Sequence, residues 1–341
     1  MSWRIVNTHE HPSTDFAYEL LKPYDATLVR GIWMTEEEII AQAKEADAII
    51  GTVSLQPFNR RLLTALTRCR VIAGIGTGYD TVDIEAATEL GIAITNVPDY
   101  GIDEVSGLAI TLMLALWHKL LKIDRAVKER GICFPKDKEA LDEVVHPIFR
   151  LRDQTLGIVG LGKIGMVSAL KARGLGMRVI ANDPYVLGPV MESRGVTPVD
   201  FDTLLRESDF VTIHTPLTTE THNLFSYKQF KKMKRTAYFI NTARGGCVDQ
   251  EGLIQALKEN LIAGAGIDVT VDEPMTPDNA LRTMTNVILT GHSAYYSVTA
   301  EMDLFRRPMT QVVQALQGVL PTYTVNPDVK TKWMARWSTK A

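Results

Sequence analysis

Three short segments of this sequence carry polar side chains whose types and positions could perform chemistry. Each follows an apolar run with the length and composition of a buried β-strand. In an open α/β sheet, the residues just beyond the carboxyl ends of the strands line the ligand crevice. Arg244, Glu273 and His292 can therefore converge there, although they lie far apart in the chain. The three segments are Asn241–Gly246 (NTARGG), Asp268–Pro274 (DVTVDEP) and Gly291–Ala294 (GHSA).

These residue types fit one reaction, the transfer of a hydride to the carbonyl carbon of a 2-oxo acid. That reaction needs a cation against the carbonyl oxygen and the carboxylate, and the planar guanidinium of Arg244 offers paired donors. It also needs a proton donor, and His292 is suited because an unperturbed imidazole titrates near working pH. Glu273 beside it would favour the charged, donating form. Taken singly, Arg244 and Glu273 could equally be exposed surface residues, and His292 would more often be structural.

A glycine motif indicates a dinucleotide cofactor. The predicted strand Thr155–Val159 runs into Gly160-x-Gly162-x-x-Gly165 and then into a predicted helix. The first glycine permits a tight turn, the second lets a pyrophosphate approach the backbone, and the third allows helix and strand to pack closely. The helix N-terminus then favours the anion. Asp183, about 20 residues further on, stands where this fingerprint places a carboxylate for the ribose hydroxyls.

Asp183 also predicts which dinucleotide binds. A 2′-phosphate would meet this carboxylate at a cost on the order of a few kcal/mol, and the neighbouring Pro184 and Tyr185 supply no cation. We therefore expect NAD rather than NADP. We expect no metal ion, because His9 and His11 form a lone His-x-His pair without further ligand donors nearby in the sequence.

Composition and charge argue against several classes of function. A chain of 341 residues predicts two domains. Its 37 basic and 40 acidic residues give a net charge of -3, which would not attract nucleic acid or an anionic membrane. Three cysteines without paired spacing suit a reducing compartment. We recognise no signal peptide, and the longest apolar run, 107–117, has about half the length of a membrane-spanning helix. We expect a cytoplasmic protein.

Short apolar runs alternate with segments of helical periodicity almost from end to end, which is typical of parallel sheets with crossover helices. A small α/β domain should be followed by one long helix over 103–130, an irregular arm over 131–152, and a six-stranded dinucleotide fold. A last helix over 298–318 precedes a polar tail that we expect to return to the first domain. The predicted strands are Arg4–Asn7, Ala26–Val29, Ala46–Gly51, Val71–Gly74, Ile92–Thr95, Thr155–Val159, Arg178–Asn182, Phe210–His214, Ala237–Asn241, Ala263–Asp268 and Asn286–Leu289, and the early helices are Thr35–Lys44, Asn59–Thr67 and Ile84–Leu90.

With these motifs in place, the chain resembles the D-isomer-specific 2-hydroxyacid dehydrogenase family over nearly its whole length. The resemblance rests on the glycine loop with Asp183 and on the segments NTARGG, DVTVDEP and GHSA. It implies an NAD-dependent enzyme that interconverts a small 2-oxo acid and the D-2-hydroxy acid. In such an enzyme, Arg244, Glu273 and His292 would be catalytic, and Asp268 would bind the nicotinamide carboxamide.

The resemblance also implies an architecture. The fold would be α/β, with two doubly wound parallel-sheet domains, and a Rossmann cofactor domain would be inserted into a flavodoxin-like substrate domain. Residues 1–101 and 298–341 would form the substrate domain, and residues 102–297 the cofactor domain. The long helix and the arm would form the contact of a homodimer.

Further contacts follow from positions in the family's motifs. Backbone N–H groups of Thr77 and Gly78 would hold the substrate carboxylate, a role that suits amides facing an anion. The residues expected to line the substrate pocket could equally be ordinary core side chains. The implied cofactor contacts are Gly160, Gly162, Lys163, Ile164, Gly165, Asp183, His214, Thr215, Pro216, Thr221, Thr242, Ala243, Arg244, Asp268 and His292, and the implied substrate contacts are Leu55, Gly76, Thr77, Gly78, Tyr100, Arg244 and Tyr295.

A second interpretation comes from the segments RLRDQTLGIVGLG, NDPY and HSAYYS, whose sequences resemble the branch of the family that contains the C-terminal-binding protein corepressors. That branch implies an NAD(H)-responsive binding protein with little metabolic turnover. We favour the enzyme, because the chain ends near residue 341 without the long disordered tail expected of a scaffold. Formate oxidation fits less well, since that branch resembles a Gln–His pairing and this chain has Glu273.

Overall fold

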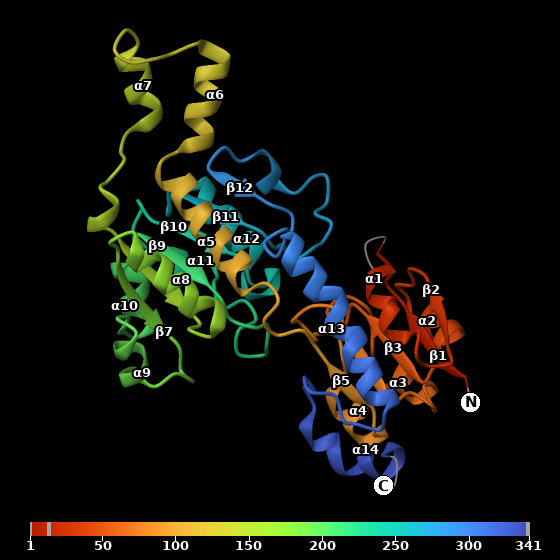
Figure 1. Ribbon diagram of the computed structural model, residues 1–341. Coiled ribbons are helices and arrows are strands. Elements are labelled where there is room, and N and C mark those ends of the chain that lie inside the picture. Colours follow the sequence, from red (N-terminus) through yellow and green to blue (C-terminus); the bar gives the residue numbers. More distant parts are fainter. Residues whose placement is uncertain (1, 12–14, 339–341) are drawn as a thin grey trace. The chain divides into compact units, whose positions relative to one another are not determined.

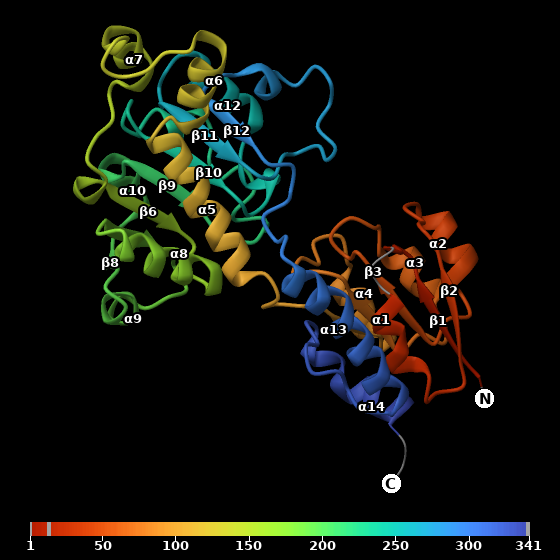
Figure 2. The ribbon, with the colours of Figure 1, turned by 45° about the horizontal axis from the view of Figure 1, so that its top comes forward.

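The computed structural model describes residues 2–11 and 15–338. The chain forms two compact units, one made of Met1–Tyr100 with Ser297–Ala341 and the other of Gly101–Tyr296. Each unit is built on a single parallel sheet (Figures 1 and 2). We call them the first unit and the second unit.

The sheet of the first unit has the order β2-β1-β3-β4-β5, and all its strands are parallel. Its central strands are runs of small and β-branched residues that are buried on both faces, as parallel strands covered by helices must be. All five strands were predicted, and their ends differ from the prediction by at most two residues. The strands are β1 (Trp3–Asn7), β2 (Ala26–Arg30), β3 (Ala48–Gly51), β4 (Val71–Gly74) and β5 (Ala93–Thr95).

Helices whose N-termini are capped by short polar side chains flank this sheet. Thr35, Asn59 and Asp83 each accept a hydrogen bond from a backbone N–H in the first turn of the helix that follows. Three helices bury their apolar residues against Val6, Ile49 and the same face of the neighbouring strands. The predicted helices are confirmed. They are α2 (Glu36–Ala43), α3 (Arg60–Ala65), α4 (Ile84–Leu90) and α13 (Val298–Leu316), and a short α1 (Asp15–Tyr18) joins them.

The tail after α13 lies in the first unit, and although its sequence is polar, it contains a helix that was not predicted. It forms α14 (Lys330–Trp337), in which Trp333 is fully buried and donates from Nε1 to the carbonyl of Arg70 at 2.8 Å. The guanidinium of Arg70 stacks on Trp3 and on Trp337, at 4.5 and 4.7 Å from the two ring centroids. The helix was missed because most residues of α14 are polar and exposed, with Trp333 fully buried and Trp337 partly buried.

The sheet of the second unit has the order β12-β11-β10-β9-β6-β7-β8, and all strands are again parallel. The six predicted strands are present, and a seventh was missed. This is the two-residue edge strand β8 (Thr197–Pro198), whose length and proline gave no strand pattern in the sequence. The others are β6 (Thr155–Val159), β7 (Arg178–Asn182), β9 (Phe210–Ile213), β10 (Tyr238–Asn241), β11 (Gly264–Ile267) and β12 (Val287–Leu289).

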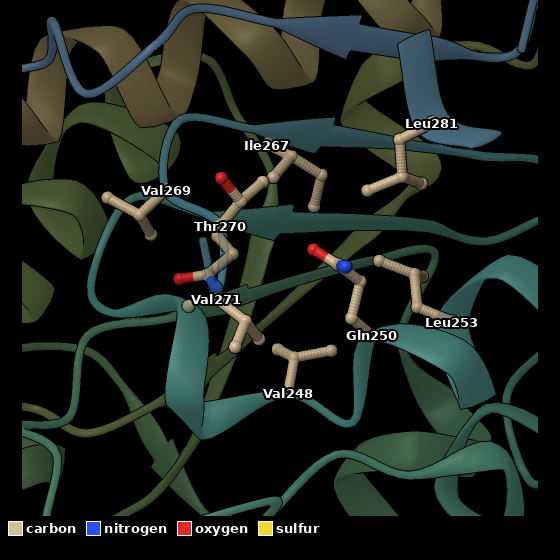
Figure 3. Close-up of a pocket in the computed structure, with 10 residues that line it drawn as sticks. Val248, Gln250, Leu253, Ile267, Val269, Thr270, Val271 and Leu281 are labelled. Carbon is tan, nitrogen blue, oxygen red and sulfur yellow. The ribbon is translucent and has the colours of Figure 1, made fainter. Parts of the chain in front are cut away.

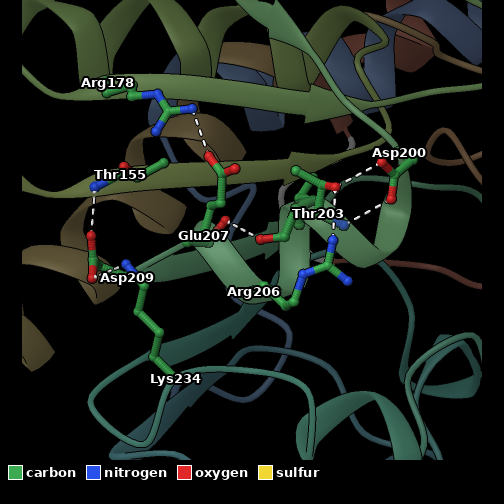
Figure 4. Close-up of polar contacts among 10 residues, drawn as sticks. Thr155, Arg178, Asp200, Thr203, Arg206, Glu207, Asp209 and Lys234 are labelled. Atoms are coloured by element: carbon green, nitrogen blue, oxygen red, sulfur yellow. Dashed lines mark hydrogen bonds and ion pairs between the residues drawn. The ribbon is translucent and has the colours of Figure 1, made fainter.

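Side chains alternate between the two faces of this sheet. In β6, Leu156 and Ile158 join the core formed with α5 and α8, and Val159 joins the core on the opposite face with residues of α10 and α12. A polar layer closes the amino ends of the strands, where Asp209 accepts from the N–H of Thr155 (Figure 4). The helices are α5 (Ile102–Trp117), α8 (Lys163–Gly174), α9 (Gly188–Ser193), α10 (Phe201–Glu207), α11 (Tyr227–Phe230) and α12 (Gln250–Lys258).

The prediction of one helix over 103–130 is wrong. α5 ends at Trp117, Lys119 adopts a left-handed conformation with φ 52°, and a separate helix α6 (Leu120–Arg130) follows at a bend of 53°. The stretch predicted to be irregular contains another helix, α7 (Lys138–Val145), which lies beside α6 (Figure 1). No single described helix is long and apolar enough to cross a membrane, and only the bent pair α5 and α6 passes that test together.

Candidate active site

The glycine loop after β6 has the geometry that a bound diphosphate needs. Gly160 has φ +88°, and a Cβ on it would lie 2.9 Å from the backbone carbon of His214. A Cβ on Gly165 would lie 2.2 Å from the carbonyl oxygen of Gly160. A Cβ on Gly162 would instead meet no atom within 4 Å. Packing therefore requires glycine at positions 160 and 165, whereas Gly162 leaves the backbone at the start of α8 open to a ligand.

Asp183, at the carboxyl end of β7, is tied to this loop. Its Oδ2 accepts a hydrogen bond from the N–H of Leu161 at 2.7 Å, and its Oδ1 accepts from the N–H of Tyr185 at 2.8 Å. A carboxylate has about four acceptor positions, so both oxygens keep capacity for ribose hydroxyls. The two amides fix the carboxylate beside the glycine loop, where the sequence motif predicted it.

Two buried polar atoms, one directly after β9 and one directly after β10, have no hydrogen-bond partner among the described residues. His214 donates from its backbone N–H to the carbonyl of Val159 at 2.8 Å, but no described residue hydrogen-bonds to its buried Nδ1. Burial lowers the pKa of His214 to about 4, so the ring is neutral at physiological pH. The buried hydroxyl of Thr242 similarly has no hydrogen-bond partner within the described part of the chain. Both residues are among the predicted cofactor contacts, and their unused polar atoms fit a bound dinucleotide.

The remaining predicted cofactor contacts shape the same edge of the sheet. Thr221 closes the turn by donating to the carbonyl of Pro216 at 2.6 Å, and the hydroxyl of Thr215 lies 3.7 Å from the sulfur of Cys247. That cysteine is fully buried and packs in the core, as expected. Lys163 and Ile164 form the first turn of α8, with Lys163 exposed, and Ala243 is held by its N–H to the side chain of Asn241 at 3.0 Å.

His292 and Glu273 form a hydrogen-bonded pair. Nδ1 of His292 lies 2.7 Å from Oε2 of Glu273, and the other carboxylate oxygen accepts from the N–H of Thr270 at 3.1 Å. Burial raises the pKa of Glu273, but the hydrogen bond and charge of His292, the Thr270 N–H and the charge of Arg244 outweigh it. The pKa of this carboxyl group therefore lies below its ordinary value, and Glu273 is ionised at neutral pH.

The loop that carries His292 is organised by Asp268, at the end of β11. Asp268 is 3% exposed, and its Oδ1 accepts from the hydroxyl of Thr290 at 2.5 Å and from the N–H of Ser293 at 2.9 Å. The N–H of His292 donates to the carbonyl of Asp268 at 2.5 Å. Gly291 and His292 both have positive φ, at 60° and 58°, so the histidine is held in a conformation that non-glycine residues rarely adopt.

Thr290 is a site residue that sequence reasoning missed. The available signal was a hydroxyl side chain at the first position after a predicted strand, directly before the GHSA segment. Its hydroxyl reaches Asp268, whose carboxylate was predicted to contact nicotinamide and in this structure also anchors the loop. Because the hydrogen bond joins neighbouring strand ends, only the order of β11 and β12 reveals it.

Arg244 follows β10 on a loop that approaches the Glu273 segment closely. The side chain of Asn241 accepts from the loop's N–H at Ala243 and donates to the carbonyl of Arg244, at 3.0 Å each, which fixes the turn. A Cβ on Gly245 would lie 2.0 Å from the carbonyl oxygen of Thr270, so glycine is required there. Since the charge of Arg244 lowers the pKa of Glu273, the structure brings the three predicted catalytic side chains into one electrostatic environment.

A small pocket lies behind these loops, between the start of α12 and the segment 269–271 (Figure 3). Its lining is mostly apolar, with Gln250 pointing in among leucine and valine side chains, and the three predicted catalytic side chains do not line it. It was not predicted. The lining residues are Asn241, Gly245, Val248, Gln250, Leu253, Ile267, Val269, Thr270, Val271 and Leu281.

The predicted substrate contacts divide between the two units. In the first unit, Gly76 has φ +100°, and the loop is held by hydrogen bonds from the hydroxyl of Thr77 to the carbonyl of Val97 at 3.0 Å and from Val97 N–H to Gly76. Among the described residues, the N–H groups of Thr77 and Gly78 donate no hydrogen bond. The other predicted contacts are Leu55 and Tyr100 in the first unit and Arg244 and Tyr295 in the second.

Comparisons with known proteins find relatives in one enzyme family. Residues 110–294 match the model of the NAD-binding domain of D-isomer specific 2-hydroxyacid dehydrogenases. A glyoxylate reductase of Korarchaeum cryptofilum (strain OPF8) is 35% identical over 295 residues, which cover 86% of this chain and 87% of that protein. A D-lactate dehydrogenase from Aquifex aeolicus, solved with NAD and lactic acid, is similar with a TM-score of 0.79 and 26% identity, covering 91% of this chain and 94% of that one. The holo D-mandelate dehydrogenase of Rhodotorula graminis has a TM-score of 0.83 and 27% identity, with coverage of 95% and 98%.

Proposed function

This chain belongs to the D-isomer specific 2-hydroxyacid dehydrogenase family, an NAD-dependent family, and from that premise we propose that it reduces a small 2-oxo acid to the D-2-hydroxy acid with His292 as proton donor. The observation that carries the proposal is the 2.7 Å contact between Nδ1 of His292 and Oε2 of Glu273. It lies in the unit that contains the glycine loop and Asp183. The resemblance to the C-terminal-binding protein branch stays a prediction.

Each catalytic side chain has a separate task in this proposal. Bound NADH would supply the hydride. Because Nδ1 of His292 is engaged by Glu273, Nε2 is the nitrogen that delivers the proton to the carbonyl oxygen, and in the reverse direction accepts it from the hydroxyl. The ionised Glu273 stabilises the imidazolium and fixes the ring. Arg244 polarises the carbonyl and binds the carboxylate through paired N–H donors.

The substrate that we propose is a monocarboxylic acid with a small or medium apolar side chain. The backbone N–H groups of Thr77 and Gly78 would take the carboxylate, while Leu55, Tyr100 and Tyr295 add bulk without a cation for a second acid group. The names of the similar proteins, which mention glyoxylate, lactate and mandelate, support a small monocarboxylate.

A panel of 2-oxo acids tests the function. Glyoxylate, pyruvate, branched and aromatic 2-oxo acids are each supplied with NADH, the loss of NADH absorbance is followed, and the product is resolved on a chiral column. We expect turnover of at least one monocarboxylate and a D-configured product wherever the product is chiral. Oxaloacetate or 2-oxoglutarate as the best substrate by kcat/KM would contradict the proposed pocket. NADH binding without turnover of any acid would contradict the enzyme.

We also propose a homodimer formed through the segment from α5 to the end of the arm. Several apolar side chains of this segment are exposed, and Phe134, at 70%, is among the most exposed. Sedimentation analysis of the full chain, compared with a variant in which Leu120 and Leu121 are replaced by serine, measures this directly. The expected result is a dimer for the unaltered chain and dissociation for the variant, and a monomeric unaltered chain would contradict the proposal.

A further inference from the structure

Tyr185 connects two carboxylates at the adenosine end of the second unit. Its backbone N–H donates to Oδ1 of Asp183 at 2.8 Å, and its hydroxyl donates to Oε2 of Glu220 at 2.7 Å. The hydrogen bond to Glu220, followed by the charge of Glu220, burial and the charge of Asp183, raises the pKa of Tyr185. The phenol therefore lies in the field of both acids, and Tyr185 alone links Glu220 to Asp183 through one hydrogen bond at each end.

The two acids approach the glycine loop from opposite sides. In the sheet, β6 lies between β7 and β9, and the glycine loop follows β6. Asp183 follows β7, whereas Glu220 belongs to the turn after β9. The hydrogen bond between Tyr185 and Glu220 therefore spans the carboxyl end of β6. The segments that carry the two acids contain no lysine or arginine over 183–193 or over 214–221. Lys163, at the start of α8, is the basic residue of the glycine loop that both cofactors would meet.

We propose that Glu220, held in place by the hydroxyl of Tyr185, is a second determinant that disfavours the 2′-phosphate of NADP, in addition to Asp183. The inference rests on the proposed contact of Asp183 with the ribose. A 2′-phosphate beside Asp183 would face two negative charges, of which Glu220 acts across solvent and is partly screened. NADH carries no charge at the 2′-oxygen, so Glu220 would not repel it there.

The test is a fluorescence titration of NADH and NADPH against the full chain and its Glu220→Gln variant. We expect NADPH to bind roughly threefold to tenfold more tightly to the variant, the size of a partly screened repulsion between like charges, while the Kd of NADH changes by less than about twofold. The gain should be larger at about 0.05 M salt than at about 0.5 M, because the Debye length shortens about threefold. An unchanged NADPH affinity overturns the inference, and so does a gain that does not depend on salt.

Glu259 provides a matched control, since it accepts a hydrogen bond from the hydroxyl of Tyr227 at 2.6 Å and is also exposed. It follows the end of α12 and so lies at the amino edge of the sheet, away from the glycine loop. Glu259→Gln makes the same change in net charge, and we expect it to leave both affinities unchanged. An equal effect of both substitutions would show that net charge alone acts and would overturn the inference.

Two further variants separate the parts of the argument. Tyr185→Phe keeps the charge of Glu220 but removes the hydrogen bond that holds it, so we expect an NADPH affinity between those of the unaltered chain and Glu220→Gln. Wild-type affinity in Tyr185→Phe overturns the role of Tyr185. Asp183→Ser, without any change at Glu220, should bring the Kd of NADPH closer to the Kd of NADH. An unchanged ratio of the two Kd values in Asp183→Ser contradicts the proposed role of Asp183, whereas a narrowed ratio there with no effect of Glu220→Gln overturns only this inference.

Discussion

In the first unit β1 lies between β2 and β3, and in the second β6 lies between β7 and β9, so each parallel sheet reverses its strand order beside its first strand. Such reversals separate the neighbouring loops and create a crevice at the carboxyl ends. In the second unit β6 ends in glycines, and a Cβ at Gly162 would meet open space. In the first unit β1 is followed by Thr8, His9 and Glu10, without any glycine.

A protein side chain fills the crevice of the first unit. Gln56 is fully buried, and its Nε2 donates to the carbonyls of Thr8 and Trp33 at 3.0 and 2.7 Å. Its Oε1 accepts from the N–H of Thr52 at 2.8 Å and from the hydroxyl of Thr8 at 3.0 Å. A Cβ on Gly51 would lie 2.7 Å from that oxygen. The same topology therefore has a glycine loop open to a ligand in the second unit and a buried glutamine, with its hydrogen bonds made within the protein, in the first. The residues that follow the strands cause this difference.

The amino ends of the two sheets, by contrast, are alike. Asp47 precedes β3 and accepts from the N–H of Arg4 at 2.8 Å, and Asp209 precedes β9 and accepts from the N–H of Thr155 at 2.8 Å. Each aspartate also pairs with a basic side chain, Arg68 in the first case and, in the second, the lysine shown in Figure 4. The amino edges of the two sheets are alike and stabilise the fold, whereas the carboxyl edges differ and carry the candidate functional residues.

The largest expected effect comes from removing His292, the proposed acid of the second unit. His292→Gln should lower kcat by roughly 10²–10⁴, because general acid catalysis typically contributes that much, while the Kd of NADH and the unfolding midpoint stay unchanged. Steady-state kinetics with the best 2-oxo acid, together with NADH titration, measures both. His222→Gln, at an exposed histidine of the same unit, serves as the control. Near-normal turnover in His292→Gln would mean that another group protonates the carbonyl.

The filled crevice should show the opposite pattern, an effect on stability and none on NADH. Gln56→Met keeps the approximate length of the side chain but leaves its buried polar neighbours unpaired, so we expect the free energy of unfolding to fall by roughly 2–4 kcal/mol. Urea unfolding followed by circular dichroism measures this change. Gln255→Met, at an exposed position, should have little effect. If Gln56→Met weakened NADH binding severalfold, the two crevices would not be independent.

The contrast between the crevices also explains which features were predictable from the sequence. Glycine spacing, the acid at 183 and the segments after strands are local patterns, and the structure places these residues as expected at the carboxyl edge of one sheet. Long apolar strands were equally visible. The amide network of Gln56 was not, because a glutamine that follows a strand is mostly exposed and only the order of β1 and β3 buries it.

Other features escaped because their cause is tertiary. The break at Lys119 interrupts a continuous helical pattern, and the structure shows the Trp117 indole donating to the carbonyl of Phe149 and the Lys119 ammonium donating to that of His146. α14 buries Trp333 against the sheet of the first unit, although its sequence is largely polar. Such contacts join residues far apart in the chain, so local periodicity does not predict them.

A smaller effect of pH on stability should appear in both units. Burial lowers the pKa of His214 to about 4, and burial followed by the charge of His11 lowers that of His9. A histidine whose pKa is lower in the folded state than in the unfolded state costs stability as pH falls below about 6.5, because the unfolded chain binds the proton first. Between pH 6.5 and about 4, His214 should thus account for a loss of roughly 1–3 kcal/mol, and His9 for a loss of the same sign.

Urea unfolding at pH 7 and pH 5 measures this loss as the difference between the unaltered chain and each glutamine variant. The variants His214→Gln and His9→Gln should lose less stability on acidification than the unaltered chain does. His222→Gln is the exposed control and should lose as much as the unaltered chain. A parallel loss in all four proteins would mean that the pKa of neither buried histidine is lowered by folding.

The smallest expected effect is a shift in a pH profile, and it tests whether the open crevice couples its acid to a neighbouring charge. Reduction requires protonated His292, so kcat/KM should fall as pH rises. Glu273 lies 2.7 Å from the ring, and its lowered pKa keeps it ionised down to acidic pH, so its charge stabilises the imidazolium across the working range. Glu273→Gln removes this charge and should therefore move the fall in kcat/KM to lower pH. Asp272→Asn removes an adjacent exposed charge and should leave the profile in place. If the profile moved in Asp272→Asn and stayed fixed in Glu273→Gln, the neighbouring aspartate would be the group coupled to His292.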